Sequence, residues 1–296
     1  MRRQIRPWLA SNGWLLAAGM LPAILLVGAL IYFTGWVVAM SFTDLELVGR
    51  KSIDWSWIGL TNYERLFTRK GFLDSLWTTV IFTLFSAIIG QSVLGFLLAT
   101  ALRGTRGVLR NVVEVSVMLG WLLPDIVAAF LWSATTSKTG LVNNLFVTPF
   151  GAAPVNFIND LALQIVIIAN IWKGTAWSYL LFVAALDSVP REVIEAAKVD
   201  GASPWQRAWL IVLPMIRTHI ATNLLFITIA TVTYFALIYA MTGGGPGRQT
   251  QVLAIFMYEQ SFKIGKLGYG SAISVAMLII VGVMSLAYIR MLREPK

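Results

Sequence analysis

The sequence contains no cysteine and a single histidine, His219. It therefore has no disulfide, no thiolate nucleophile, no cysteine-based metal site and no site built from several histidines. Charged residues are also scarce, at 12% against about 25% in a typical soluble domain. Hydrophobic residues make up 57% of the 296 positions. This composition excludes a disordered chain, a secreted disulfide scaffold and an ordinary soluble domain, and it predicts an integral membrane protein.

Six apolar runs are each long enough to cross a hydrocarbon core of about 30 Å as a helix. Helices are expected because lipid offers backbone groups no partners, and the period-two alternation of a membrane barrel is missing. We therefore predict an all-α membrane protein that forms one domain over residues 1–296. Its six spans are expected near residues 14–40, 76–102, 115–132, 161–186, 220–241 and 270–289.

The basic residues indicate orientation rather than nucleic-acid binding. The net charge is +9, but the lysines and arginines lie in short segments between the apolar runs. They are densest at the chain ends and in the connections that follow the second and the fourth apolar run. The chain ends contribute Arg2, Arg3, Arg6, Arg293 and Lys296. By the positive-inside rule, both termini are expected in the cytoplasm.

The long cytoplasmic connection, residues 187–217, has the pattern of two short helices. Gly201 follows Asp200 and is a stop signal for the first helix. Ser203, Pro204 and Gln206 then form an N-terminal capping sequence for the second helix. The segment is therefore predicted to be a helix, a glycine turn and a second helix.

This segment resembles the EAA loop of ABC importer permeases. That pattern is Glu-Ala-Ala, three residues, Gly, nine residues and Ile-x-Leu-Pro, and the chain matches it without a gap. The resemblance implies that the loop is a coupling helix that docks in a cleft of an ATPase subunit. The matching positions are Glu195, Ala196, Ala197, Gly201, Ile211, Leu213 and Pro214.

A phosphate-binding loop is missing from the chain. No G-x-x-x-x-G-K-[ST] sequence occurs, and the glycine-rich segment 243–247 lacks the lysine that should follow. We therefore expect this chain to be no enzyme and to hold no cofactor. ATP and Mg²⁺ would be bound by separate ATPase subunits.

Further segments resemble the maltose-type carbohydrate permeases, over nearly the whole chain after residue 14. They include Ser41-Phe-Thr-Asp44, Gly59-Leu-Thr-Asn-Tyr63 and Thr242-Gly-Gly-Gly-Pro246. The last of these is similar to the first of the two permeases that such systems encode. The resemblance implies the type I importer fold in the cell inner membrane and a sugar substrate. It also implies a second permease, two ATPase subunits and an extracytoplasmic solute-binding protein as partners.

Two charged residues lie inside predicted spans, where charge is rare and usually functional. Asp125 and Lys173 are each about 20 Å from the inner face if their spans are straight helices. We therefore expect them to pair or to line the same polar cavity. An ion pair that only fixes helix packing remains the alternative.

One face of the fourth span combines polar and aromatic residues, as sugar sites do. Asn170, Lys173, Gly174 and Trp177 fall at i, i+3, i+4 and i+7. Such stripes more often serve packing, but the family resemblance places substrate contacts on the fourth and fifth spans. The positions it implies are Asn170, Trp172, Trp177, Thr231 and Tyr234. Lys173 departs from the family pattern and suggests a polar or anionic group on the solute.

The sequence thus favours a permease that imports a sugar or sugar-like solute by alternating access. The main competing hypothesis is an ion-coupled secondary transporter that uses Asp125 and Lys173 as its relay. That hypothesis leaves the 195–214 pattern unexplained. An intramembrane enzyme would need more acids, bases or metal ligands, and an efflux half-transporter would usually carry its own ATPase.

Overall fold

The computed structural model describes residues 13–292, and these residues form helices, turns and an isolated β-bridge between Thr43 and Trp57. The predicted all-α class is confirmed. The terminal residues Arg2, Arg3, Arg6, Arg293 and Lys296, on which the expected orientation partly depends, lie outside the described range. Two compact units divide the described chain. The prediction of one domain stays a prediction.

The first unit holds residues 13–65 together with Gln260–Val275. It contains α2 (Gly13–Met40), η1 (Arg50–Ser52), most of α3 (Thr61–Thr68) and the first part of α17 (Leu267–Leu292). The loop after α2 is fixed by Asn62, whose Nδ2 donates to the carbonyls of Ser41 at 2.9 Å and Thr43 at 2.8 Å. The hydroxyls of Ser41 and Tyr63 lie 2.6 Å apart. The sequence segments 41–44 and 59–63 therefore meet in one structure.

The second unit holds Leu66–Glu259 and residues 276–292. One long helical rod is made of α4 (Lys70–Phe82), the π-helical η2 (Thr83–Gln91) and α5 (Ser92–Leu102). It is followed by α6 (Val108–Leu122), α7 (Asp125–Thr136), α8 (Leu141–Phe146), η3 (Thr148–Phe150), α9 (Phe157–Asp160) and α10 (Ala162–Asp187). The later elements are α11 (Arg191–Val199), α12 (Pro204–Arg207), η4 (Ala208–Val212), α13 (Leu213–Met215), α14 (Arg217–Val232), α15 (Ala236–Thr242), α16 (Leu253–Tyr258) and the start of η5 (Glu259–Lys263).

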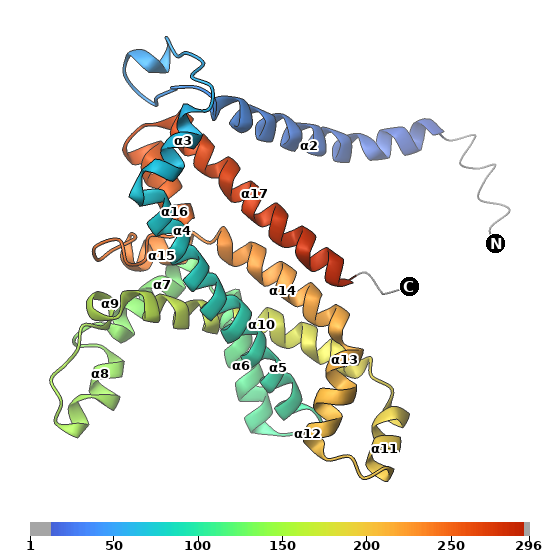
Figure 1. Cartoon of the computed structure of the whole chain (residues 1–296). Coiled ribbons are helices and arrows are strands. Elements are labelled where there is room, and N and C mark those ends of the chain that lie inside the picture. Colours follow the sequence, from blue (N-terminus) through green and yellow to red (C-terminus); the bar gives the residue numbers. More distant parts are fainter. Residues whose placement is uncertain (1–12, 293–296) are drawn as a thin grey trace. The chain divides into compact units, whose positions relative to one another are not determined.

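Helix α10 is the centre of the second unit, and it packs against η2, α5, α6 and α14 (Figure 1). A close approach between α5 and α10 depends on Gly95, where an added Cβ would lie 2.5 Å from the Ser178 Cβ. Small residues allow such approaches between membrane helices. An apolar cluster around Phe182, Leu186 and Ile216 closes the end of this packing at which α10 terminates.

Four helices have the length and composition of membrane spans: Gly19–Met40, Lys70–Leu102, Ala162–Asp187 and Leu267–Arg290. Two further spans are bent pairs. The pair Val108–Leu122 and Asp125–Phe146 is bent by 115°, and the pair Pro204–Met215 and Arg217–Val232 is bent by 70°. Six spans result if each bent pair is counted as one.

The prediction of the third span as one straight helix over 115–132 was wrong. Pro124 has no N–H to donate and disfavours a helical conformation at Leu123, which is extended with ψ 136°. The predicted helix over 220–241 was also wrong in part, because it is interrupted between Val232 and Ala236. Both interruptions contribute residues to the site described next.

Candidate functional site

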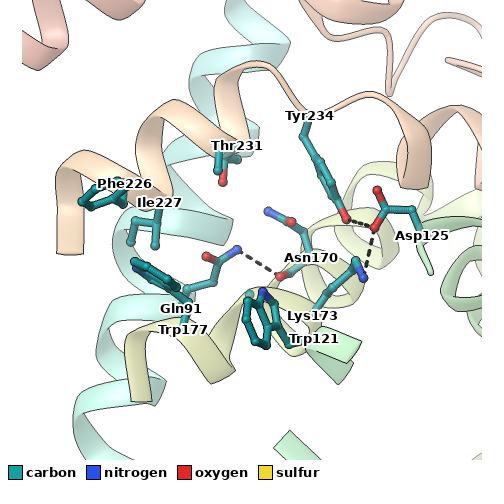
Figure 2. A pocket seen from close by; sticks show the side chains of 12 residues that line it. Gln91, Trp121, Asp125, Asn170, Lys173, Trp177, Phe226, Ile227, Thr231 and Tyr234 are labelled. Atoms are coloured by element: carbon teal, nitrogen blue, oxygen red, sulfur yellow. Dashed lines mark hydrogen bonds and ion pairs between the residues drawn. The ribbon is translucent and has the colours of Figure 1, made fainter. Parts of the chain in front are cut away.

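A cavity of about 440 Å³ lies in the second unit, between η2, α10 and the two interrupted helices α6–α7 and α14–α15 (Figure 2). Its volume is within the range of small-molecule pockets. Five of the six residues predicted to contact substrate line it, together with Asp125. The lining residues are Gln91, Trp121, Asp125, Asn170, Lys173, Gly174, Trp177, Phe226, Ile227, Ala230, Thr231 and Tyr234.

Each helix interruption places one polar side chain at the cavity. Asp125 is the first residue of α7, directly after Pro124. Tyr234 lies between α14 and α15, and its backbone N–H donates to the Thr231 carbonyl at 3.1 Å. At these two points the backbone leaves the helical path and changes direction. The breaks therefore bring both side chains to α10, where Asp125 contacts Lys173 and Tyr234 contacts Asp125.

Asp125, Lys173 and Tyr234 form one bonded group. Lys173 Nζ lies 3.0 Å from Asp125 Oδ1, and the Tyr234 hydroxyl donates to the same oxygen at 2.9 Å. Lys173 Nζ also donates to the Leu123 carbonyl at 2.6 Å. That carbonyl is left free of a helical donor by the break at Pro124, so the lysine compensates for the interruption.

Asn170 joins α10 to the long rod. Its Nδ2 donates to Ser86 Oγ at 2.8 Å, and Gln91 Nε2 donates to the Asn170 carbonyl at 3.0 Å. Asn170 is almost fully buried. Much of its hydrogen-bonding capacity is thus used within the protein, and the residue fixes the floor of the cavity as well as lining it.

Aromatic rings border the polar group. The rings of Trp177 and Phe226 lie 5.6 Å apart, and Trp121 lines the cavity from α6. Flat aromatic surfaces beside hydrogen-bonding groups suit a ligand with both C–H faces and hydroxyls.

Trp172 was predicted to contact substrate but does not line the cavity. Its ring packs edge-on against Trp132 at 6.1 Å and lies against Gly120. Neighbouring residues on a helix point about 100° apart, so Trp172 and Lys173 face different neighbours. Sequence reasoning also missed Gln91 and Trp121. Gln91 was detectable as a polar residue within an apolar run, but Trp121 had no comparable signal.

The predicted helix–turn–helix of the 187–217 connection is confirmed. Helix α11 ends at Val199 and is capped by Asp200, and Gly201 after the cap has a φ of +79°. The N–H of Ala202 donates to the Ala197 carbonyl at 2.9 Å, and that of Gly201 donates to Lys198 at 3.1 Å, which is a Schellman motif. The expected capping box is present, with Ser203 N–H donating to Gln206 Oε1 at 2.8 Å.

The residues that match the loop pattern differ in exposure. Glu195, Ala196, Gly201 and Pro214 are exposed, whereas Ala197 is buried and Ile211 and Leu213 are half-buried. Exposed apolar side chains accompany them on α11, α12 and η4, namely Val199, Trp205 and Leu210. The loop thus combines side chains that pack within the protein with apolar side chains that remain exposed.

The start of the loop, where α10 ends, is held by Arg103, which follows α5. Its Nη2 donates to the Leu186 carbonyl at 2.8 Å, and its Nε lies 3.8 Å from Asp187 Oδ1. The last turn of α10 is thereby attached to the end of the long rod. Among residues 13–292, no group of three or more His, Cys, Asp or Glu side chains could hold a metal.

Known proteins resemble this chain over most of its length. The family model for a binding-protein-dependent transport system inner membrane component matches residues 91–293. The trehalose transport system permease protein SugA of Mycobacterium tuberculosis is 34% identical over 270 residues, which cover 91% of this chain and 85% of that protein. The trehalose/maltose transport system permease protein MalF of Thermococcus litoralis is 32% identical over 239 residues, 79% of each chain.

A third relative, the sulfoquinovosyl glycerol transport system permease protein SmoG of Agrobacterium fabrum, is 31% identical and covers 97% of this chain and 93% of its own. The fold is shared with a chain in the crystal structure of a bacterial alginate ABC transporter bound to its periplasmic protein. That match has a TM-score of 0.78 and 23% identity, and it covers 96% of this chain and 95% of the other. The apolar helices and the family together show a multi-pass membrane protein. The chain belongs to the family of binding-protein-dependent transport system inner membrane components, the ABC importer permeases that include the maltose type.

Proposed function

We propose that this chain is the permease subunit that carries a sugar or sugar-like solute through the membrane into the cytoplasm by alternating access. Separate ATPase subunits would supply the energy, since the sequence contains no phosphate-binding loop. An extracytoplasmic binding protein would deliver the solute. A second permease would complete the translocation path, and both termini would lie in the cytoplasm.

One observation carries this proposal, namely that α10 bears both the cavity and the loop. Lys173 and Trp177 line the cavity from the middle of the helix. The same helix ends at Asp187, and α11 begins at Arg191. A displacement of α11 is therefore transmitted to the cavity through one continuous helix.

The cavity chemistry supports a carbohydrate as the solute. Amide, hydroxyl and carboxylate groups lie beside Trp121 and Trp177. The curated relatives named above transport trehalose, maltose and sulfoquinovosyl glycerol, according to their names. We assign substrate contact to Asn170, Lys173, Trp177, Thr231 and Tyr234, with Asp125 added.

The exposed surface of the loop supports docking on an ATPase subunit. Glu195 offers a carboxylate to a basic partner, and Ala196 permits close approach of another backbone. Val199, Trp205 and Leu210 would lose their exposed apolar surface on docking. The removal of this apolar surface from water would favour association.

The test compares Gly201→Ala with Gly151→Ala in the complex reconstituted into liposomes. Both glycines have positive φ, +79° and +75°, and neither has a neighbour within 4 Å of an added Cβ. The two substitutions therefore impose similar local strain, about 1–2 kcal/mol. Only Gly201→Ala should lower retention of the ATPase subunits and the ATP hydrolysis stimulated by loaded binding protein.

Equal effects of the two substitutions would contradict the docking role of the loop. Uptake driven by an ion gradient, with no ATPase subunit present, would contradict the whole assignment. In that case the Asp125–Lys173 pair would become the leading candidate for an ion relay.

A further inference from the structure

We infer that the cavity selects an uncharged polyhydroxy solute over its anionic counterparts. The charge of Lys173 is already paired with Asp125 within the protein, and the second carboxylate oxygen of Asp125 is free to accept a hydrogen bond. This inference rests on the proposed function and specifies the charge of the solute. It also revises the sequence-based suggestion that Lys173 would bind an anionic group.

The charge of Lys173 is used inside the protein. An ammonium group has three donors, and two of them are directed at the Leu123 carbonyl and at Asp125 Oδ1, at 2.6 and 3.0 Å. The side chain is only 11% exposed. A solute anion would therefore have to compete with a carboxylate that is already in contact with Lys173.

Asp125 is the more accessible member of the pair, with its side chain 30% exposed. Both contacts, from Lys173 and from Tyr234, are made to Oδ1. Oδ2 has no donor among the described residues, and it is not among their fully enclosed unpartnered polar atoms. Figure 2 shows this oxygen directed away from the two dashed contacts. A carboxylate oxygen in this position is an acceptor for a hydroxyl donor.

The rest of the cavity carries no charge that would favour an anion. Apart from Asp125 and Lys173, the lining side chains are neutral, and the polar ones include Gln91, Asn170 and Thr231. The formal charges of the lining therefore cancel. A neutral sugar can donate a hydroxyl hydrogen bond to Asp125 Oδ2, whereas a carboxylate or sulfonate placed there would meet a like charge in a partly buried site.

The experiment measures solute binding to the purified complex, without the binding protein, so that the specificity of the binding protein does not enter the result. Equilibrium dialysis is carried out with radiolabelled trehalose and maltose. Each is compared with its uronate, in which one hydroxymethyl group is oxidised to a carboxylate. The two members of a pair share their ring geometry and differ by one charge.

The parent complex should bind at least one neutral disaccharide roughly tenfold more tightly than its uronate, about the worth of one charged hydrogen bond. Asp125→Asn leaves the lysine charge unbalanced and should shift this ratio by at least about tenfold toward the uronate. The double variant Asp125→Asn, Lys173→Gln should restore the neutral preference. Asp160→Asn, an exposed carboxylate outside the cavity lining, should leave the ratio unchanged.

The inference is overturned if the parent complex binds each uronate as tightly as its neutral sugar. It is equally overturned if the parent complex binds none of the four compounds. It is also overturned if Asp125→Asn changes the ratio no more than Asp160→Asn does. Failure of the proposed function would appear differently, as solute uptake that does not require ATPase subunits. That result would leave the measured charge preference intact.

Discussion

Tyr234 donates a hydrogen bond of 2.9 Å to Asp125 Oδ1 and thereby joins the interruption between α14 and α15 to the interruption between α6 and α7. The two residues are 109 positions apart in the chain. Interrupted helices at membrane depth are tolerated where the freed backbone lines a cavity or is buried in protein. This contact therefore links the two places at which the helices around the cavity are discontinuous.

Replacement of Tyr234 by Phe removes this link and keeps the ring. We expect the complex to lose about 1–2 kcal/mol of stability, because Oδ1 of the half-buried Asp125 loses a donor. Solute affinity should also fall, since Asp125 would be less firmly positioned. The measurements are thermal unfolding of the detergent-solubilised complex and equilibrium dialysis. Tyr32→Phe, at an exposed ring on α2, is the control and should change neither quantity.

The pair formed by Asp125 and Lys173 should behave as a unit. Either Asp125→Asn or Lys173→Gln alone leaves one charge without its partner, so each should destabilise more than the two together. A double-mutant cycle on chemical unfolding should give a coupling free energy of about 1–3 kcal/mol. Additive effects within about 0.5 kcal/mol would show that the 3.0 Å contact contributes nothing to stability.

The apolar runs were sufficient to predict the membrane helices, because lipid requires long uninterrupted stretches of apolar residues. The 187–217 loop was predictable in detail, since Gly201 and Ser203 act on backbone groups within a few residues of themselves. Capping and turn hydrogen bonds of this kind can be predicted from nearby residues alone. The contribution of the loop to docking on an ATPase subunit stays a prediction.

The interruptions of the helices were not predicted. Pro124 is a sequence signal for the first, because proline disfavours a helical conformation at the preceding residue, but the prediction followed only the length of the apolar run. The break between Val232 and Ala236 contains neither proline nor glycine, so it depends on packing against distant residues. The error at Trp172 has a similar origin. A helical pattern identifies residues that share a face, but it does not say which neighbour that face contacts.

Gly95 should tolerate no side chain, because α5 and α10 approach closely there. An alanine Cβ would lie 2.5 Å from Ser178 Cβ and 2.9 Å from the Tyr179 backbone nitrogen. Gly95→Ala is expected to destabilise by about 1–3 kcal/mol through overpacking. Thermal unfolding provides the measurement. Gly282→Ala in α17, with no atom within 4 Å of the added Cβ, should be neutral or slightly stabilising.

Ser203 should matter as the N-cap of the second loop helix rather than through a direct contact with an ATPase subunit. Ser203→Ala removes the acceptor for the Gln206 N–H, now at 3.2 Å, and should cost the second loop helix about 1 kcal/mol. Faster hydrogen exchange across residues 203–207, together with weaker retention of ATPase subunits, would be the observable result. Ser203→Asp supplies another good cap and should restore both. A failure of aspartate to rescue would point to a direct contact of the serine instead.

Asp44 should make the loop after α2 sensitive to acid. Lys51 Nζ lies 2.8 Å from Asp44 Oδ2, and the Ser56 N–H donates to Oδ1 at 2.7 Å. The contact with Lys51, followed by that with Ser56, lowers the pKa of Asp44 below its ordinary value of 3.8. Because the folded pKa is the lower one, this stabilisation is fully present above pH 3.8 and is lost as the pH falls through the folded pKa.

Hydrogen exchange of residues 44–56, corrected for the intrinsic rate at each pH, should therefore be slow above pH 5 and rise steeply below about pH 4. Asp44→Asn cannot ionise, so its loop should exchange faster at pH 6 and show little further change on acidification. Asp54→Asn removes an exposed ion pair with Arg50 and should follow the parent profile, since exposed pairs contribute little. An Asp44→Asn profile that overlays the parent at every pH would mean that the Asp44 contacts do not hold the loop, and that the backbone bond from Asp44 N–H to the Ser56 carbonyl at 3.1 Å is sufficient.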